Sequence, residues 1–151
     1  MIEINTHLCG MNCEIITIGD ELLIGQVIDT NSAWMATRLN ESGIRVKQLT
    51  SVSDDKLHII EALDQAKTRA DIILITGGLG PTRDDLTKDT LCEYFDSDLE
   101  VNQKVLGHLD AYFTSRGRQL TETNSKQAEV PVKCTTVFNY HGTAPGMLFD
   151  E

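Results

Sequence analysis

The chain has 151 residues, 40% of them hydrophobic and 24% charged, which is typical of one globular domain and not of a disordered chain. Its 13 basic and 23 acidic side chains give a net charge of −10, which argues against non-specific binding to nucleic acid. No apolar run reaches the about 18 residues of a membrane-spanning helix, so no membrane partner is expected.

The first ten residues carry no basic region and no apolar core, so they do not form a secretory signal. We expect residues 1–10 to be an extension or tag outside the fold and residues 11–151 to form the domain. Four cysteines occur in the chain without zinc-ligand spacing, which favours free thiols and a cytoplasmic location. Three of them are interpreted as small core residues, at positions Cys13, Cys92 and Cys134.

The first half of the chain alternates strands with helices. Apolar, β-branched runs predict strands at 13–18, 44–52 and 71–76. A helix is predicted over 32–42, capped by Thr30 or Asn31, with Trp34, Met35 and Leu39 on its apolar face. A second helix begins after Ser53 or Asp54, with Leu57 on its apolar face. This order demands parallel strands with right-handed crossovers, and therefore an α/β fold with helices on both sides of a sheet.

The second half has shorter elements. Helical spacing predicts helices at 85–95 and 101–116, separated by a break at 96–98, and a short polar helix at 121–128. Two more strands are expected at 135–138 and 147–149.

A glycine-rich loop follows the third strand. Ligands bind outside the carboxyl ends of parallel strands, and glycines let a ligand approach the backbone N–H groups closely. A loop of this kind before a helix is suited to an anion, with Gly77, Gly78, Gly80 and Thr82 as the binding residues. It matches neither the Walker A pattern nor G-x-G-x-x-G, and a plain flexible turn is the alternative.

Four carboxylates accompany these strand ends. Asp84 and Asp85 close the glycine loop, and Asp20 and Glu21 follow the first strand. Oxygen ligands beside a phosphate site are a common way to hold Mg²⁺, so all four are candidate metal ligands. The alternatives are carboxylates that stabilise a helix N-terminus and a solvated turn.

Two further segments offer polar groups to a ligand. A third glycine loop contains Gly142 and Thr143, with a tight turn as its alternative. Asn124 and Gln127 share one side of the short helix, where they could bond a ribose, a base or a pterin, although a solvated face explains the spacing equally well.

In combination, these segments resemble the CinA family of competence/damage-inducible proteins. The resemblance is carried by five motifs in family order from about residue 11 to the end, listed here as they stand: Gly19-Asp20-Glu21-Leu22-Leu23, Thr76-Gly77-Gly78-Leu79-Gly80-Pro81-Thr82, Asp84-Asp85-Leu86-Thr87, Asn124 with Gln127-Ala128 and Pro131, and Gly142-Thr143-Ala144-Pro145-Gly146. It implies a molybdopterin-binding-like domain, a three-layer α/β/α fold with a mostly parallel central sheet, as in the molybdopterin adenylyltransferases. Family members continue beyond the last motif, so we expect the domain to be truncated at its C-terminus.

The resemblance also implies an activity. The family domain is associated with a metal-dependent pyrophosphatase that cleaves ADP-ribose to AMP and ribose 5-phosphate. The implied catalytic residues are Asp84, Asp85 and Asp20, with a divalent metal, Mg²⁺ in the first instance, as cofactor. One alternative is a module that binds molybdopterin or a nucleotide without turnover. Another is a dimerising scaffold for a nicotinamide-mononucleotide deamidase, either a C-terminal domain or a separate protein. A homo-oligomer is expected.

Overall fold

A computed structural model describes residues 10–82 and 85–150 of the chain. Within them the chain forms two compact units, which meet in sequence between Gly78 and Leu79. The boundary falls inside the predicted glycine loop, so the first two loop glycines belong to unit 1 and the remainder to unit 2. Each unit is described by itself.

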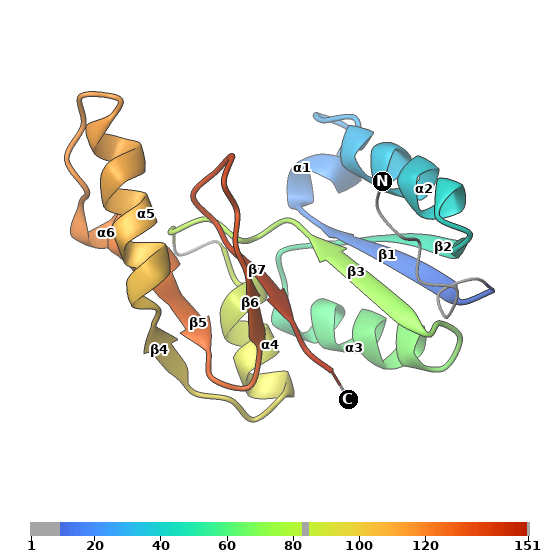
Figure 1. Cartoon of the computed structure of the whole chain (residues 1–151). Coiled ribbons are helices and arrows are strands. Elements are labelled where there is room, and N and C mark those ends of the chain that lie inside the picture. Colours follow the sequence, from blue (N-terminus) through green and yellow to red (C-terminus); the bar gives the residue numbers. More distant parts are fainter. Residues whose placement is uncertain (1–9, 83–84, 151) are drawn as a thin grey trace. The chain divides into compact units, whose positions relative to one another are not determined.

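Unit 1 is built on a three-stranded parallel sheet. Its strands are β1 (Asn12–Ile18), β2 (Arg45–Val52) and β3 (Ile72–Thr76), in the order β2-β1-β3. The connections are helical: α1 (Asp20–Leu23) and α2 (Thr30–Glu41) follow β1, and α3 (Lys56–Lys67) follows β2. Figure 1 shows α2 on one face of this sheet and α3 on the other. The predicted parallel α/β arrangement with helices on both faces is confirmed.

Apolar residues cover both faces of β1. Cys13 and Ile15 are fully buried in a cluster with Ile44, against which Met35 and Leu39 of α2 pack. The buried residues of α3 are Ile59, Ala62, Leu63 and Ala66. Cys13 is therefore a core residue as predicted, while Cys92 and Cys134 are only partly buried.

A buried charge also lies in β1. Glu14 is fully buried, and both of its carboxylate oxygens accept from the guanidinium of Arg69, at 2.7 and 2.8 Å. The Thr50 hydroxyl of β2 donates to the same carboxylate at 2.7 Å. Because a buried carboxylate is tolerated only when it is paired and hydrogen-bonded, these contacts fix how β1, β2 and the end of α3 fit together.

The helix caps in unit 1 differ from those predicted. Asp29 caps α2 by accepting from the Ser32 amide at 2.9 Å, so the predicted caps Thr30 and Asn31 already lie inside the helix. Asp55, and neither Ser53 nor Asp54, caps α3. Asp, Asn and Ser all cap well, so a run of such residues does not show from sequence alone which one begins the helix.

Two residues assigned to apolar helix faces point to solvent instead. Trp34 is 63% exposed and lies under the guanidinium of Arg38, 5.6 Å from the ring centroid. Leu57 is 66% exposed in the first turn of α3. Helical spacing alone therefore did not identify which residues of these two helices are buried.

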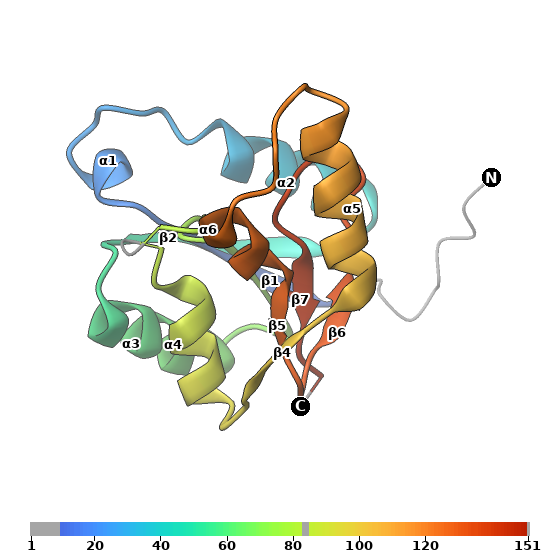
Figure 2. The ribbon, with the colours of Figure 1, turned by 90° about the vertical axis from the view of Figure 1, so that its left-hand side faces the viewer.

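Unit 2 contains short elements. Its helices are α4 (Thr87–Tyr94), α5 (Gln103–Thr114), α6 (Glu122–Ser125) and the 3-10 turn η2 (Lys126–Ala128). Two antiparallel pairs accompany them: β4 (Leu99–Val101) with β5 (Glu129–Pro131), and β6 (Thr135–Val137) with β7 (Gly146–Leu148). Val105 and Leu109 of α5 are buried against Ala128. In Figure 2 the chain can be followed through β6 and its long loop into β7.

The sequence predicts most of unit 2 but misses β4 and β5. These strands have three residues each, too few for an alternating pattern to be recognised, and their residues adjoin the predicted break and the end of the short helix. Among the described residues, no helix is long and apolar enough to cross a membrane.

Candidate functional site

Two of the predicted site segments meet at the carboxyl edge of the unit 1 sheet. Gly77 has a φ of +103°, and a Cβ there would overlap the carbonyl oxygen of Ile18 at the end of β1. Glu21 folds back over Gly19, where a Cβ would lie 2.7 Å from the carboxylate. The structure therefore brings the β1 exit, with Asp20 and Glu21, against the β3 exit, with Gly77 and Gly78. Gly19 and Gly77 therefore allow close contacts within the chain.

The exit of β2 contributes residues that the sequence analysis did not single out. The Asp54 carboxylate accepts from the Asp20 amide at 3.0 Å. Its neighbour Ser53 places Oγ 2.5 Å from Nδ1 of His58 in α3. The same argument from strand ends that selected Asp20 also applies to Asp54, which follows the carboxyl end of β2 by two residues.

In unit 2, the remainder of the glycine loop closes around one carboxylate. Oδ1 of Asp85 accepts from the Gly80 amide at 2.8 Å, and Oδ2 accepts from the Thr82 amide at 2.9 Å and from the Thr82 hydroxyl. A Cβ at Gly80 would overlap this carboxylate, so a larger residue there would displace the Asp85 side chain from its present hydrogen bonds. The carboxylate that these loop groups bind is the loop's own Asp85, and the predicted binding of a ligand anion by Gly77, Gly78, Gly80 and Thr82 stays a prediction.

These contacts perturb the titration of Asp85. Burial raises the pKa of the carboxyl, but the hydrogen bonds from Thr82 and Gly80 outweigh burial, so the pKa lies below its ordinary value. Both carboxylate oxygens of Asp85 already accept hydrogen bonds from loop groups, which leaves them less available to a metal ion. Asp84, the other predicted catalytic carboxylate in this loop, lies outside the described residues.

The third glycine loop, between β6 and β7, is held by a single side chain. Oδ1 of Asn139 accepts from the amides of His141 and Gly142, at 3.0 and 3.1 Å, and its Nδ2 donates to the Ala144 carbonyl at 3.0 Å. A Cβ on Gly142 would lie 2.9 Å from Nδ2. The predicted residues Gly142 and Thr143 thus lie in a loop of defined shape. This loop contacts α5, where His108 Nε2 is 3.2 Å from the Gly142 carbonyl oxygen.

The two amide residues predicted for the site, Asn124 and Gln127, lie in different elements, α6 and η2. The Thr121 hydroxyl caps α6 by accepting from the Asn124 amide at 3.2 Å, while Gln127 lies in η2 and is only 7% exposed. Gln127 lines a pocket and Asn124 does not. The change from α-helix to 3-10 turn between them alters the angular spacing on which a shared face depends.

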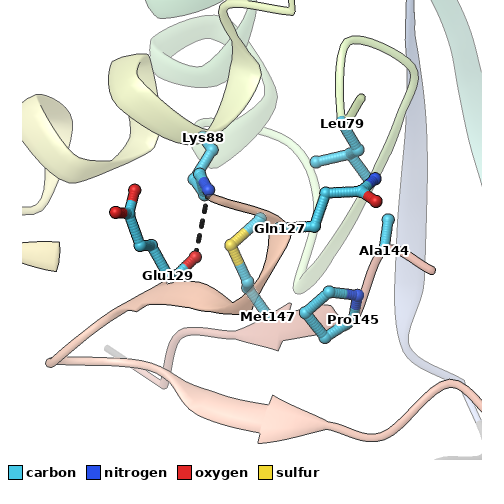
Figure 3. A pocket seen from close by; sticks show the side chains of 7 residues that line it. All are labelled: Leu79, Lys88, Gln127, Glu129, Ala144, Pro145 and Met147. Carbon is cyan, nitrogen blue, oxygen red and sulfur yellow. Dashed lines mark hydrogen bonds between the residues drawn. The ribbon is translucent and has the colours of Figure 1, made fainter. Parts of the chain in front are cut away.

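The pocket draws on three of the motif segments (Figure 3). Leu79 comes from the glycine loop and Gln127 from η2, while Ala144, Pro145 and Met147 come from the end of the third glycine loop and β7. Lys88 of α4 and Glu129 of β5 complete the lining. Because these segments are far apart in sequence and meet at one place in unit 2, the pocket is the candidate site.

Lys88 is the cationic group of this pocket. Its Nζ donates to the carbonyl oxygens of Lys126 and Glu129, at 2.8 and 3.0 Å (Figure 3 shows the second). Burial lowers the pKa of the amine, and the negative charges of Glu129 and Asp89 partly oppose that effect. Sequence reasoning missed Lys88, because one lysine after a glycine loop has no pattern of its own.

The metal site predicted from sequence requires carboxylates that lie close together. Among residues 10–82 and 85–150, no three His, Cys, Asp or Glu side chains gather in a way that could hold a metal ion. Asp20 and Glu21 are adjacent carboxylates at the sheet edge, and Mg²⁺ is often held by only one or two protein carboxylates together with substrate phosphates and water. The metal-binding roles of Asp20, Glu21 and Asp85 stay predictions, and Asp85 differs from the other two in that both of its oxygens accept hydrogen bonds from the loop.

Comparison with known proteins gives a consistent result. Residues 14–150 match the family model described as "Probable molybdopterin binding domain". The chain is 50% identical over 145 residues to a CinA-like protein of Flavobacterium psychrophilum, an alignment that covers 93% of this chain and 34% of that protein. It thus spans about a third of the length of this curated relative.

Solved structures similar to the chain include the following two. CinA of Thermoplasma acidophilum, described as being of unknown function, matches with a TM-score of 0.78 and 33% identity, over 91% of this chain and 80% of that one. The tungsten cofactor synthesizing protein MoaB of Pyrococcus furiosus matches with a TM-score of 0.56 and 25% identity, over 74% of this chain and 69% of that one.

Proposed function

The chain belongs to the molybdopterin-binding domain family and to its CinA-like members, and from this premise we propose that its unit 2 pocket binds a small phosphorylated nucleotide or pterin. The observation that carries the proposal is the convergence of three loop and turn segments, through Leu79, Gln127 and Ala144, on one pocket. A fold alone does not determine a ligand, so the chemistry of this lining decides the class of molecule.

The lining suits a molecule with an apolar, planar part and an anionic part. Leu79, Pro145 and Met147 offer apolar surface, and the Gln127 amide provides both donors and an acceptor. Lys88 supplies positive charge: a lysine ammonium has three donors, and two of them bind carbonyl oxygens here. The third would donate to a ligand oxygen.

We further propose, from the family resemblance, that the bound ligand contains a pyrophosphate and that the protein hydrolyses ADP-ribose to AMP and ribose 5-phosphate. A divalent metal would polarise a phosphoryl oxygen and lower the pKa of a bound water. By the same resemblance, Asp20, Glu21, Asp84 and Asp85 are the carboxylates proposed to hold this metal, with Asp84, Asp85 and Asp20 as the proposed catalytic residues. A binding module without turnover is the alternative.

Calorimetric titration tests the binding proposal. ADP-ribose, AMP and pterin are each titrated into the wild-type chain and into Lys88→Met, with Lys133→Met as the matched control. Lys133 also lies in unit 2 and donates to a backbone carbonyl, that of Phe95 at 3.0 Å, but it does not line the pocket. Removing a charge-assisted hydrogen bond of about 1.5–3 kcal/mol predicts a Kd at least about tenfold higher for Lys88→Met only. Equal affinities for both variants would contradict the assigned pocket.

Hydrolysis is tested separately. The release of AMP from ADP-ribose is followed with and without Mg²⁺ in the wild type, in Asp20→Asn and in Glu21→Gln. Metal-dependent release that falls in both variants supports the pyrophosphatase. Saturable binding without AMP release would leave the binding module as the function.

A further inference from the structure

Two of the cysteines lie in unit 2, on segments that face each other. Cys92 is in the last turn of α4, and Cys134 is in the turn between β5 and β6. Both are partly buried and both carry free thiols. Neither of them lines the pocket, so the proposed function gives them no role.

Hydrogen bonds join α4 and β5 at two places along their length. Near the start of α4, Nζ of Lys88 donates to the carbonyl oxygen of Glu129 at 3.0 Å (Figure 3). Beyond the end of α4, the carbonyl oxygen of Asp98 accepts from the amide of Val132 at 2.9 Å. The helix and the strand therefore run side by side in the same direction, and Cys92 lies between these two contacts.

The helix and strand periods place Cys134 beside Cys92. Residues four apart share a helix face, so Cys92 faces β5 one turn beyond Lys88. Four helix residues advance the chain by about 6 Å and two strand residues by about 6.6 Å, so Pro131 lies opposite Cys92. The Cys134 amide donates to the Pro131 carbonyl at 3.2 Å, so the turn brings Cys134 back to the same point.

The surroundings of both thiols disfavour the thiolate form. Burial raises the pKa of Cys92, the negative charges of Asp89 and Cys134 raise it further, and the positive charge of Lys88 opposes them. Burial also raises the pKa of Cys134. A disulfide carries no charge, so the burial that penalises two thiolates does not penalise the bond between them.

We propose that Cys92 and Cys134 form a reversible disulfide that joins the β5–β6 turn to α4. The oxidant is a low-molecular-weight disulfide such as oxidised glutathione. One cysteine thiolate attacks a glutathione sulfur and releases one glutathione thiolate, and the second cysteine then displaces the other glutathione from the mixed disulfide. The two cysteines lose two electrons to oxidised glutathione, and their two protons are taken up by the released glutathione thiolates.

The bond would add a covalent link to an arrangement that hydrogen bonds now hold. Because Lys88 lies one turn before Cys92 on the same face of α4, the link would also restrain Lys88 against the carbonyl oxygens of Lys126 and Glu129. Oxidation would thus limit the movement of α4 beside the pocket. This inference does not depend on which ligand the pocket binds.

Peptide mapping by mass spectrometry tests the bond in the wild-type chain. The reduced protein is equilibrated with oxidised glutathione, its remaining thiols are alkylated, and it is digested with trypsin. Cleavage after Lys88, Lys104 and Lys133 places Cys92 in peptide 89–104 and Cys134 in peptide 134–151. We expect these two peptides to be linked within one chain and to separate on reduction. Recovery of both peptides alkylated, or each carrying glutathione, would overturn the proposal.

Cysteine variants check the pairing. Cys92→Ser and Cys134→Ser should each abolish the linked peptide pair. Cys9→Ser is the matched control, because it removes a cysteine that lies outside the described residues, and it should leave the link intact. A link from Cys92 or Cys134 to Cys9, or between two chains, would contradict the assigned pair.

Urea unfolding shows whether the bond fits the folded chain. A cross-link between residues 92 and 134 restricts the unfolded chain, so the oxidised wild type should unfold at a higher urea concentration than the reduced protein. Cys134→Ser treated with the same oxidant should show no such increase. An unchanged or lower midpoint for the linked wild type would mean that the bond forms only by distorting the fold, which would overturn the proposal.

Discussion

In unit 1, the predicted site residues lie where the parallel strands of the sheet end. In unit 2, the pocket is lined partly by two loops, and one polar side chain holds each of these loops in place. In unit 1, β1 lies between β2 and β3, and its apolar residues Cys13 and Ile15 are fully buried. In unit 2, Asp85 shapes one loop and Asn139 another, through three hydrogen bonds each. Substitutions in unit 1 should therefore act mainly on stability, and substitutions of loop-holding residues in unit 2 mainly on binding.

The largest expected effect is on stability. Ile15→Ala removes a fully buried side chain from the core cluster of unit 1 and leaves a cavity. The free energy of unfolding should fall by about 3 kcal/mol. Urea unfolding followed by circular dichroism measures the change, and the exposed substitution Leu57→Ala serves as the control. A loss below about 1 kcal/mol for Ile15→Ala would show that β1 is not a core strand.

Asn139→Ala should have the next largest effect, and on binding more than on stability. It removes three hydrogen bonds that shape the β6–β7 loop. Because the loop groups are at least partly exposed, water can replace these bonds, so the loop loses its shape at little cost to the stability of the whole fold. The Kd of AMP should rise about tenfold while the urea midpoint changes little. Asn139→Asp keeps the acceptor and loses the donor to Ala144, so its Kd should lie between those of the wild type and Asn139→Ala. An unchanged Kd would separate this loop from the site.

Asp85→Asn tests whether the carboxylate supports the loop or the chemistry. The asparagine keeps one oxygen, which can accept from either the Gly80 amide or the Thr82 amide. It loses the negative charge that strengthens both hydrogen bonds. For this partly exposed group we expect a loss of about 1 kcal/mol in loop stability, seen as faster hydrogen exchange of the Gly80 amide. If exchange is unchanged while AMP release stops, Asp85 is a catalytic group and not a structural one.

The smallest expected effect is the dependence of the same loop on pH. Hydrogen bonds hold the pKa of Asp85 below its ordinary value, so the ionised carboxylate stabilises the folded loop above the ordinary carboxyl pKa. This contribution is lost as the pH falls through the lowered pKa of the folded loop. The Gly80 amide resonance should therefore titrate below the ordinary carboxyl range, and its titration should disappear in Asp85→Asn. A midpoint at or above that range would contradict the assigned hydrogen bonds.

The sequence predicts unit 1 better than unit 2, and the reason is physical. Long apolar runs such as the one that forms β3 specify buried parallel strands by themselves. Strands of three residues, such as β4 and β5, depend on partners that lie about 30 residues away in the chain, and no local pattern records that pairing. The helix caps were misplaced for a related reason, because Asp29, Thr30 and Asn31 can all cap a helix.

Three of the predicted site segments contribute residues to the unit 2 pocket, and their role in binding stays a prediction. Gln127 lines the pocket, and the glycine loops contribute to it through Leu79 and Ala144, neighbours of the predicted glycines. Lys88 was missed because its significance lies in burial beside two carbonyl oxygens, which only the folded chain provides. The roles of Asp20, Glu21 and Asp84 in metal binding or hydrolysis stay predictions.

The central claim is that the loop segments of unit 2 form one binding site. An NMR titration of the ¹⁵N-labelled chain with AMP tests it most directly. We predict saturable shifts that are concentrated at the pocket residues Leu79, Lys88, Gln127 and 144–147. Saturable shifts confined to residues 10–78, or the absence of any shift in unit 2, would contradict the claim.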